Sequence, residues 1–177
     1  MNIHIFQEIN DIIKSVRGAD LMARMSYVTN LEEWQSEFSF KITIQVRFSE
    51  TDLFGHMNNT VPFVYFEEAR IEYLNYLGLM QEWTKSHNEI IPVVADLQCD
   101  FLQQVFFNEK IDVYVKIGNV GNSSIDLHYM GINPKGEICF TGRNSLVNIS
   151  RHTGRSERWK DEWKELLKSE VNKTINV

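Results

Sequence analysis

RFSETDLFGHMNNTVPFVYFEEAR, residues 47–70, is the point at which this sequence changes from a strand-like to a helix-like pattern. The stretch gathers the carboxylate of Asp52, the glycine Gly55, the imidazole of His56 and the two amides of residues 58–59 within a few positions. Glycine and asparagine are typical of turns, and an aspartate or asparagine before an apolar run is typical of a helix start. Two interpretations therefore stand together: a catalytic turn, or a well-capped start of a helix.

The hydrophobic period changes across this stretch. Residues 38–48, FSFKITIQVRF, alternate as a strand does and place five apolar side chains on one face. Those side chains are Phe40, Ile42, Ile44, Val46 and Phe48. Residues 62–77 follow a helical period and are apolar around much of the helix, which predicts a buried helix that ends at Gly78.

Four strand-like runs follow the helix, at 90–105, 110–120, 123–133 and 137–150. Because short, turn-like joins separate them, we expect an antiparallel meander of these strands. A helix too apolar for a surface position, followed by such a meander, predicts an α+β domain of two layers.

Both ends of the chain show the spacing of amphipathic helices. The apolar positions are Ile5, Ile9, Ile12 and Val16 near the N-terminus, and Trp159, Trp163, Leu166 and Leu167 near the C-terminus. We expect an N-terminal helical extension over 1–38, a main domain over 39–155, and a C-terminal helix and tail over 156–177.

The composition excludes several classes of protein. The length of 177 residues suggests a single domain, and the formal net charge of −6 argues against a general nucleic-acid binder. No run approaches the roughly 20 apolar residues of a membrane span, and Glu8 and Asp11 interrupt any signal-peptide core. Cys99 and Cys139 lie far apart without metal-ligand spacing, which favours free thiols. These features predict a cytoplasmic protein.

The quoted stretch resembles the start of hotdog-fold acyl-CoA thioesterases of the 4-hydroxybenzoyl-CoA thioesterase-like group. The matching positions are Arg47, Phe48, Glu50, Asp52, Gly55, His56, Met57, Asn58, Asn59, Phe63, Phe66, Glu67, Ala69 and Arg70. In element order the resemblance extends over residues 39–165. It implies a hotdog fold, in which a curved antiparallel sheet wraps around a long central helix, and a working homodimer or dimer of dimers with active sites between subunits.

The resemblance also assigns roles in thioester hydrolysis. It places the catalytic carboxylate on Asp52, which would either attack the carbonyl or deprotonate water. It places the backbone donor for the thioester oxygen near Asn59, with Asn58 beside it, at a helix start whose N–H groups and dipole favour negative charge. The alternative for Asn58 and Asn59 is a simple N-cap, and the two roles are compatible because the backbone does the chemistry while the side chain caps.

Four further residues are candidates for the site. His56 has the chemistry of a general base, but the resemblance favours a neighbour that shapes the pocket. Glu67 is a possible second carboxylate, although its spacing to Arg70 favours an ion pair. Ser123 and Ser124 are candidates for contact with the pantetheine arm, and a tight turn explains them equally well. No metal and no cofactor are expected, since CoA is part of the substrate.

Two functions from different classes follow from these residues. The first is a thioesterase acting on an acyl-CoA or acyl-carrier-protein thioester. The second is a hotdog module that binds such a thioester without cleaving it, as a sensor or regulator. Retention of Asp52 favours the enzyme, and the same motif disfavours a third possibility, a hotdog hydratase.

Overall fold

The structure is a computed structural model, and it describes residues 25–171. The predicted N-terminal helix lies outside the described residues. Of the described residues, 25–35 belong to one unit and Ser36 begins a second, so each is described by itself. In the first, Asn30 caps the start of α3 (Leu31–Ser36), because its Oδ1 accepts hydrogen bonds from the backbone N–H groups of Glu32 and Glu33.

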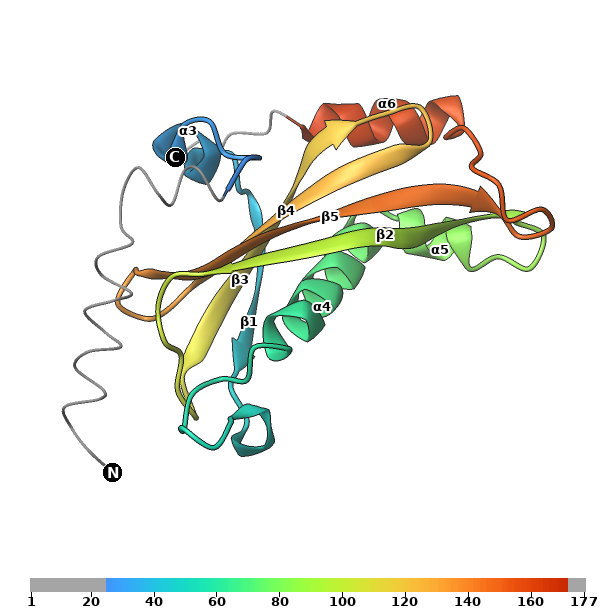
Figure 1. The fold of residues 1–177 in the computed structure, drawn as a ribbon. Helices are drawn as coiled ribbons and strands as arrows, with labels where there is room; N and C mark the ends of the chain where they lie inside the picture. The colour runs from blue at the N-terminus through green and yellow to red at the C-terminus, as the bar shows by residue number, and fades with distance from the viewer. Residues whose placement is uncertain (1–24, 172–177) are drawn as a thin grey trace. The chain divides into compact units, whose positions relative to one another are not determined.

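The second unit is an antiparallel sheet with helices, shown in Figure 1. Its elements are β1 (Phe40–Gln45), η1 (Phe48–Glu50), α4 (Val61–Tyr76), α5 (Leu79–Trp83), β2 (Ile90–Phe101), β3 (Lys110–Val120), β4 (Ser124–Ile132), β5 (Ile138–Ser150) and α6 (Asp161–Glu170). The five strands have the order β1-β3-β4-β5-β2, and every neighbouring pair is antiparallel. The predicted α+β class is therefore confirmed.

The predicted four-stranded meander is wrong for its first strand. Only β3, β4 and β5 follow one another as hairpins, whereas β2 pairs with β5 at one edge of the sheet and β1 pairs with β3 at the other. The join 102–109 is not a tight turn, because the backbone N–H groups of Leu102 and Gln103 both donate to the carbonyl of Cys139 and carry the chain past the start of β5. Turn length alone does not reveal a long-range pairing of this kind.

The long helix α4 lies across one face of the sheet (Figure 1). Its buried side includes Phe66, whose ring stacks on Tyr129 of β4 with centroids 4.4 Å apart. Gly142 of β5 makes this packing possible, because a Cβ there would lie 2.4 Å from the Phe66 ring. The other side of the helix is exposed, with Val64 and Tyr76 on it, so the prediction of a buried helix holds for the sheet-facing half only.

Two predicted elements end earlier or begin later than expected. Ile44 and Val46 are buried as the strand pattern predicts, but Phe48 leaves the strand for the short turn η1 and its side chain is 76% exposed. Trp159 precedes α6 rather than belonging to it, because the helix begins at Asp161. It is nevertheless buried, against the ring of Trp83 on α5.

Both cysteines are free thiols, as predicted. Cys139 is buried and Cys99 is half-buried, and burial raises the pKa of each thiol to about 12. Within residues 25–171, no helix is long and apolar enough to cross a membrane.

Candidate functional site

The site is built on one loop, the motif turn, which we define as residues 50–58. Its two ends are joined, because the Asn58 N–H donates to the Glu50 carbonyl at 2.8 Å and Thr51 forms a β-bridge with Met57. Gly55 has a φ of +82°, a left-handed conformation that glycine adopts without steric cost. The predicted turn at this glycine is confirmed.

Asp52 closes the motif turn with one of its carboxylate oxygens. Oδ1 accepts hydrogen bonds from the backbone N–H groups of Phe54 at 2.8 Å and His56 at 3.3 Å. No residue among 25–171 donates a hydrogen bond to Oδ2, and the side chain is only half-buried. The carboxylate thus stabilises the turn through one oxygen and leaves the other without a donor among the described residues.

The start of α4 supplies the second part of the site. Asn58 closes the turn before α4, because its Oδ1 accepts from the backbone N–H of Thr60 at 3.0 Å and from its hydroxyl at 2.9 Å. The N-cap position is Thr60, without a side-chain capping hydrogen bond, so the alternative of Asn58 or Asn59 as the N-cap is wrong. The carbonyl of Asn58 accepts from the Val61 N–H, and Pro62 has no N–H to satisfy. Asn59 is an exposed residue, and its N–H finds no hydrogen-bond acceptor in the described part of the chain. A backbone donor is therefore available just before the start of α4.

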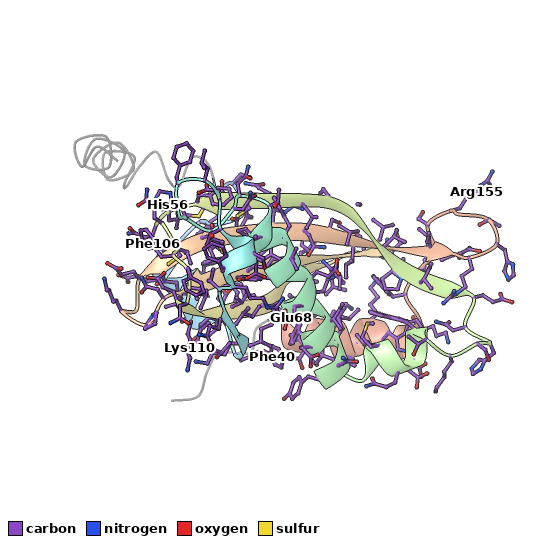
Figure 2. All side chains as sticks on the ribbon, turned by 90° about the horizontal axis from the view of Figure 1, so that it is seen from below. Phe40, His56, Glu68, Phe106, Lys110 and Arg155 are labelled. Atoms are coloured by element: carbon purple, nitrogen blue, oxygen red, sulfur yellow. The ribbon has the colours of Figure 1, made fainter. Side chains whose placement is uncertain are left out.

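His56 fastens the motif turn to the 102–109 join. Its ring meets that of Phe106 edge-on, with centroids 5.2 Å apart, and the two residues form an isolated β-bridge. The Met57 N–H adds a hydrogen bond of 2.7 Å to the Val105 carbonyl. Figure 2 shows His56 and Phe106 together at one end of the sheet. This packing gives His56 a structural role.

The remaining sequence candidates are not gathered at the motif turn of the same chain. Glu67 points outward on α4 and pairs with Arg70 at 3.8 Å, the ion pair that its spacing predicts. Ser123 and Ser124 lie at the far end of β3, whose 11 residues span about 35 Å at about 3.3 Å each. The Ser123 carbonyl accepts from Asn148 near the end of β5, the end where Figure 2 shows Arg155.

Sequence reasoning gave no role to a polar link between the motif turn and α4. Oε2 of Glu50 accepts from the Tyr65 hydroxyl at 2.7 Å and from the Arg47 backbone N–H at 2.8 Å. Burial and the hydrogen bond to Glu50 raise the pKa of Tyr65 above its usual value. The three-residue spacing of Arg47 and Glu50 was a visible sign of the local part of this link, whereas the contact with Tyr65 depends on the fold.

A groove of about 530 Å³ adjoins the start of the motif turn. The aromatic rings of Phe48 and Phe107, which meet edge-on at 5.9 Å, form part of its wall. The rest of the wall is formed by charged Arg47 and Glu68 and by Thr43, Ile44, Gln45, Val46 and Asn108. The groove suits a ligand that has both apolar and polar parts.

Residues 46–167 match the family model of the thioesterase-like superfamily. The chain belongs to this superfamily. It is 49% identical over 136 residues to the uncharacterized protein YsmA of Bacillus subtilis, an alignment that covers 77% of this chain and 90% of YsmA. The resemblance read from residues 47–70 is thereby confirmed at the level of the family.

Solved structures of the superfamily share the fold. A DHNA-CoA thioesterase from Staphylococcus aureus is 26% identical with a TM-score of 0.65, over 73% of this chain and 88% of that one. A thioesterase from Thermus thermophilus, complexed with coenzyme A and Zn, is also 26% identical, with a TM-score of 0.64 over 77% and 98% of the two chains. The predicted hotdog fold is confirmed.

No group of three or more His, Cys, Asp or Glu side chains in the described range is placed to hold a metal ion. His56 and Asp52 are in contact through the backbone of the motif turn. The chemistry available at this turn is thus that of a carboxylate, an imidazole and a backbone N–H.

Proposed function

We propose that this member of the thioesterase-like superfamily hydrolyses an acyl-CoA or acyl-carrier-protein thioester to a free acid and a thiol. One observation carries the proposal: the motif turn and the helix start that follows it present a carboxylate oxygen of Asp52 and the N–H of Asn59, neither of which has a hydrogen-bond partner within residues 25–171. These are the two groups that thioester hydrolysis requires, a nucleophile or base and an oxyanion donor. The superfamily assignment supports the reaction type in general.

In the proposed mechanism, the thioester carbonyl lies between these two groups. Asp52 either attacks the carbonyl carbon, giving a mixed anhydride that water then hydrolyses, or removes a proton from an attacking water. In both cases the C–S bond breaks, the thiol leaves, and the Asn59 N–H stabilises the developing oxyanion. Removal of such a donor typically lowers kcat by a factor of about 100 to 1000.

The other candidates have supporting roles in this proposal. Asn58 fixes the helix start through its hydrogen bonds to Thr60, and His56 shapes the wall of the site through its contact with Phe106. The groove beside Phe48 matches the amphipathic character of an acyl-pantetheine group. Glu67 is engaged with Arg70, so we assign it no catalytic step. The reaction as proposed needs no cofactor, since CoA is part of the substrate.

We further propose that two copies of the chain associate through β2. This strand lies at an edge of the sheet and pairs with β5 alone among the described strands. It leaves three large apolar side chains 40–49% exposed, namely Val94, Leu97 and Phe101. An exposed apolar edge strand is a template for pairing with another chain. Because Ser123 and Ser124 lie far from the motif turn of their own chain, a pantetheine contact by either would have to come from another copy.

The experiment that tests the function is a thiol-release assay with purified protein and a panel of short-chain, long-chain and aromatic acyl-CoAs. We expect free CoA to appear with at least one of them. Binding of acyl-CoAs by calorimetry without any release of thiol, across the whole panel, would instead identify a non-catalytic binding module.

A further inference from the structure

Glu50 makes contact with three separate parts of the chain. Its backbone carbonyl accepts from the Asn58 N–H, and its Oε2 accepts from the Arg47 N–H at 2.8 Å. The same oxygen accepts from the hydroxyl of Tyr65, which belongs to the second turn of α4, at 2.7 Å. One residue therefore joins the beginning of the motif turn, its end, and the helix that follows it.

The contacts of Glu50 lie on both sides of the two groups that the proposed mechanism uses, the Asp52 carboxylate and the Asn59 N–H. Asp52 follows Glu50 by two residues inside the motif turn, and Asn59 follows the Asn58 that Glu50 holds. The far side of the motif turn is attached elsewhere, by His56 and Met57 to the 102–109 join. The hydrogen bond from Tyr65 to Glu50 therefore fixes the near side of the turn directly to α4.

We propose that Glu50 is a positioning residue, which holds the motif turn on α4 through Tyr65. It sets the distance between the Asp52 carboxylate and the Asn59 N–H. Both of its oxygens are engaged within the chain, because Oε2 accepts two hydrogen bonds and Oε1 lies 3.7 Å from Nη1 of Arg47. The inference rests on the proposed function. A displacement of about 1 Å between reacting groups can cost a factor of about 100 in rate, so the role has a kinetic signature.

The chain offers an internal control for this link. Tyr73, also on α4 and also buried, donates its hydroxyl to Oε2 of the buried Glu170 at 3.2 Å. It lies eight positions further along the helix, about 12 Å away at about 1.5 Å per residue. Tyr65→Phe and Tyr73→Phe therefore each remove one tyrosine–glutamate hydrogen bond from the same helix, part-buried in the first case and buried in the second, and only the first removes a bond to the motif turn.

The test measures kcat and KM for thioester hydrolysis, together with melting temperature, for Tyr65→Phe, Tyr73→Phe, Glu50→Gln and Glu50→Ala. We expect both tyrosine variants to lose stability, but only Tyr65→Phe to lose kcat, by about 10-fold, with KM changed less than about twofold. Glu50→Gln keeps an acceptor oxygen, so its kcat should fall less than that of Glu50→Ala. For Glu50→Ala we expect about a 100-fold fall in kcat.

Several outcomes would overturn the inference. An equal fall of kcat in Tyr65→Phe and Tyr73→Phe would show a purely structural role, and a change in KM alone would show a binding role. If the wild-type protein hydrolyses no thioester, the proposed function fails, and the link is then tested by the backbone amide NMR signal of Asn59. That signal should shift in Tyr65→Phe and stay in place in Tyr73→Phe, and an unchanged signal in both would refute the link.

Discussion

At the scale of single residues, Asp52 has two separable tasks. Oδ1 accepts two backbone hydrogen bonds and so closes the motif turn, while Oδ2 is the oxygen that we assign to chemistry. The sequence left open whether Asp52, which precedes Gly55, caps a turn or catalyses a reaction. The geometry indicates that one task does not exclude the other.

Substitution at Asp52 should separate these tasks. Asn keeps an acceptor oxygen for the Phe54 and His56 N–H groups, so we expect Asp52→Asn to change the free energy of unfolding by less than about 0.5 kcal/mol. Asp52→Ala removes the acceptor and should cost about 1–2 kcal/mol. Urea denaturation of the two variants measures the difference, and equal stability would contradict the turn-closing role.

The two free thiols, one buried and one half-buried, give a second prediction at this scale. Burial disfavours the thiolate, so the pKa of Cys99 and of Cys139 is about 12 instead of 9.0. At about pH 8 we expect a disulfide reagent to modify the native protein at least about 100 times more slowly than the urea-unfolded chain. Because unfolded thiols ionise first, stability should fall as the pH rises from about 9 to about 12. A native thiol that reacts at the unfolded rate would contradict the burial.

At the scale of elements, sequence patterns predicted the parts whose periodicity is strong. The helical period of 62–77 corresponds to α4 within a residue, and the alternation of 38–48 contains β1 but extends two to three residues beyond it at each end. The short helices α3 and α5 were not predicted, since five or six residues carry little periodic signal. The visible sign of α3 was Asn30, an asparagine at the capping position whose Oδ1 accepts from the backbone N–H groups of Glu32 and Glu33.

The packing of α4 on the sheet yields a prediction for Gly142. A Cβ at this position would lie 2.4 Å from the Phe66 ring and 2.6 Å from the backbone carbonyl oxygen of Gln98, and a backbone atom moves less readily than a side chain. We expect Gly142→Ala to lower the free energy of unfolding by about 2–3 kcal/mol. Thermal denaturation checks this, and a near-neutral variant would show that α4 packs more loosely on β5.

At the scale of the whole molecule, strand order decided what the sequence left open. The pairing of β2 with β5 depends on contacts between distant segments, so local patterns favoured a simple meander and missed the edge position of β2. Asp52 and Asn59 are close in the sequence, so it could be predicted that they share one loop. The position of Ser123 at the other end of β3 depends on long-range pairing, and local patterns gave no sign of it. The partner of Glu50 on α4 was also invisible to local patterns.

The exposed edge of β2 predicts the oligomeric state. We expect sedimentation to show a dimer or a dimer of dimers for the wild-type chain. Leu97→Lys places a charge on this apolar edge and should shift the protein toward monomer. Thr43→Lys on β1, at the opposite edge of the sheet, is the matched control and should leave the state unchanged. A wild-type monomer, or equal effects of both substitutions, would contradict association through β2.

The most direct test of the central claim compares wild-type protein with Asp52→Asn on an acyl-CoA that the wild type hydrolyses. Thiol release and calorimetric binding of the same ligand are measured, with Asp161→Asn, an exposed aspartate on α6, as the control. The account predicts that Asp52→Asn binds the ligand with unchanged affinity and releases at least about 1000-fold less thiol, while the control behaves as wild type. Hydrolysis by Asp52→Asn at the wild-type rate would contradict it.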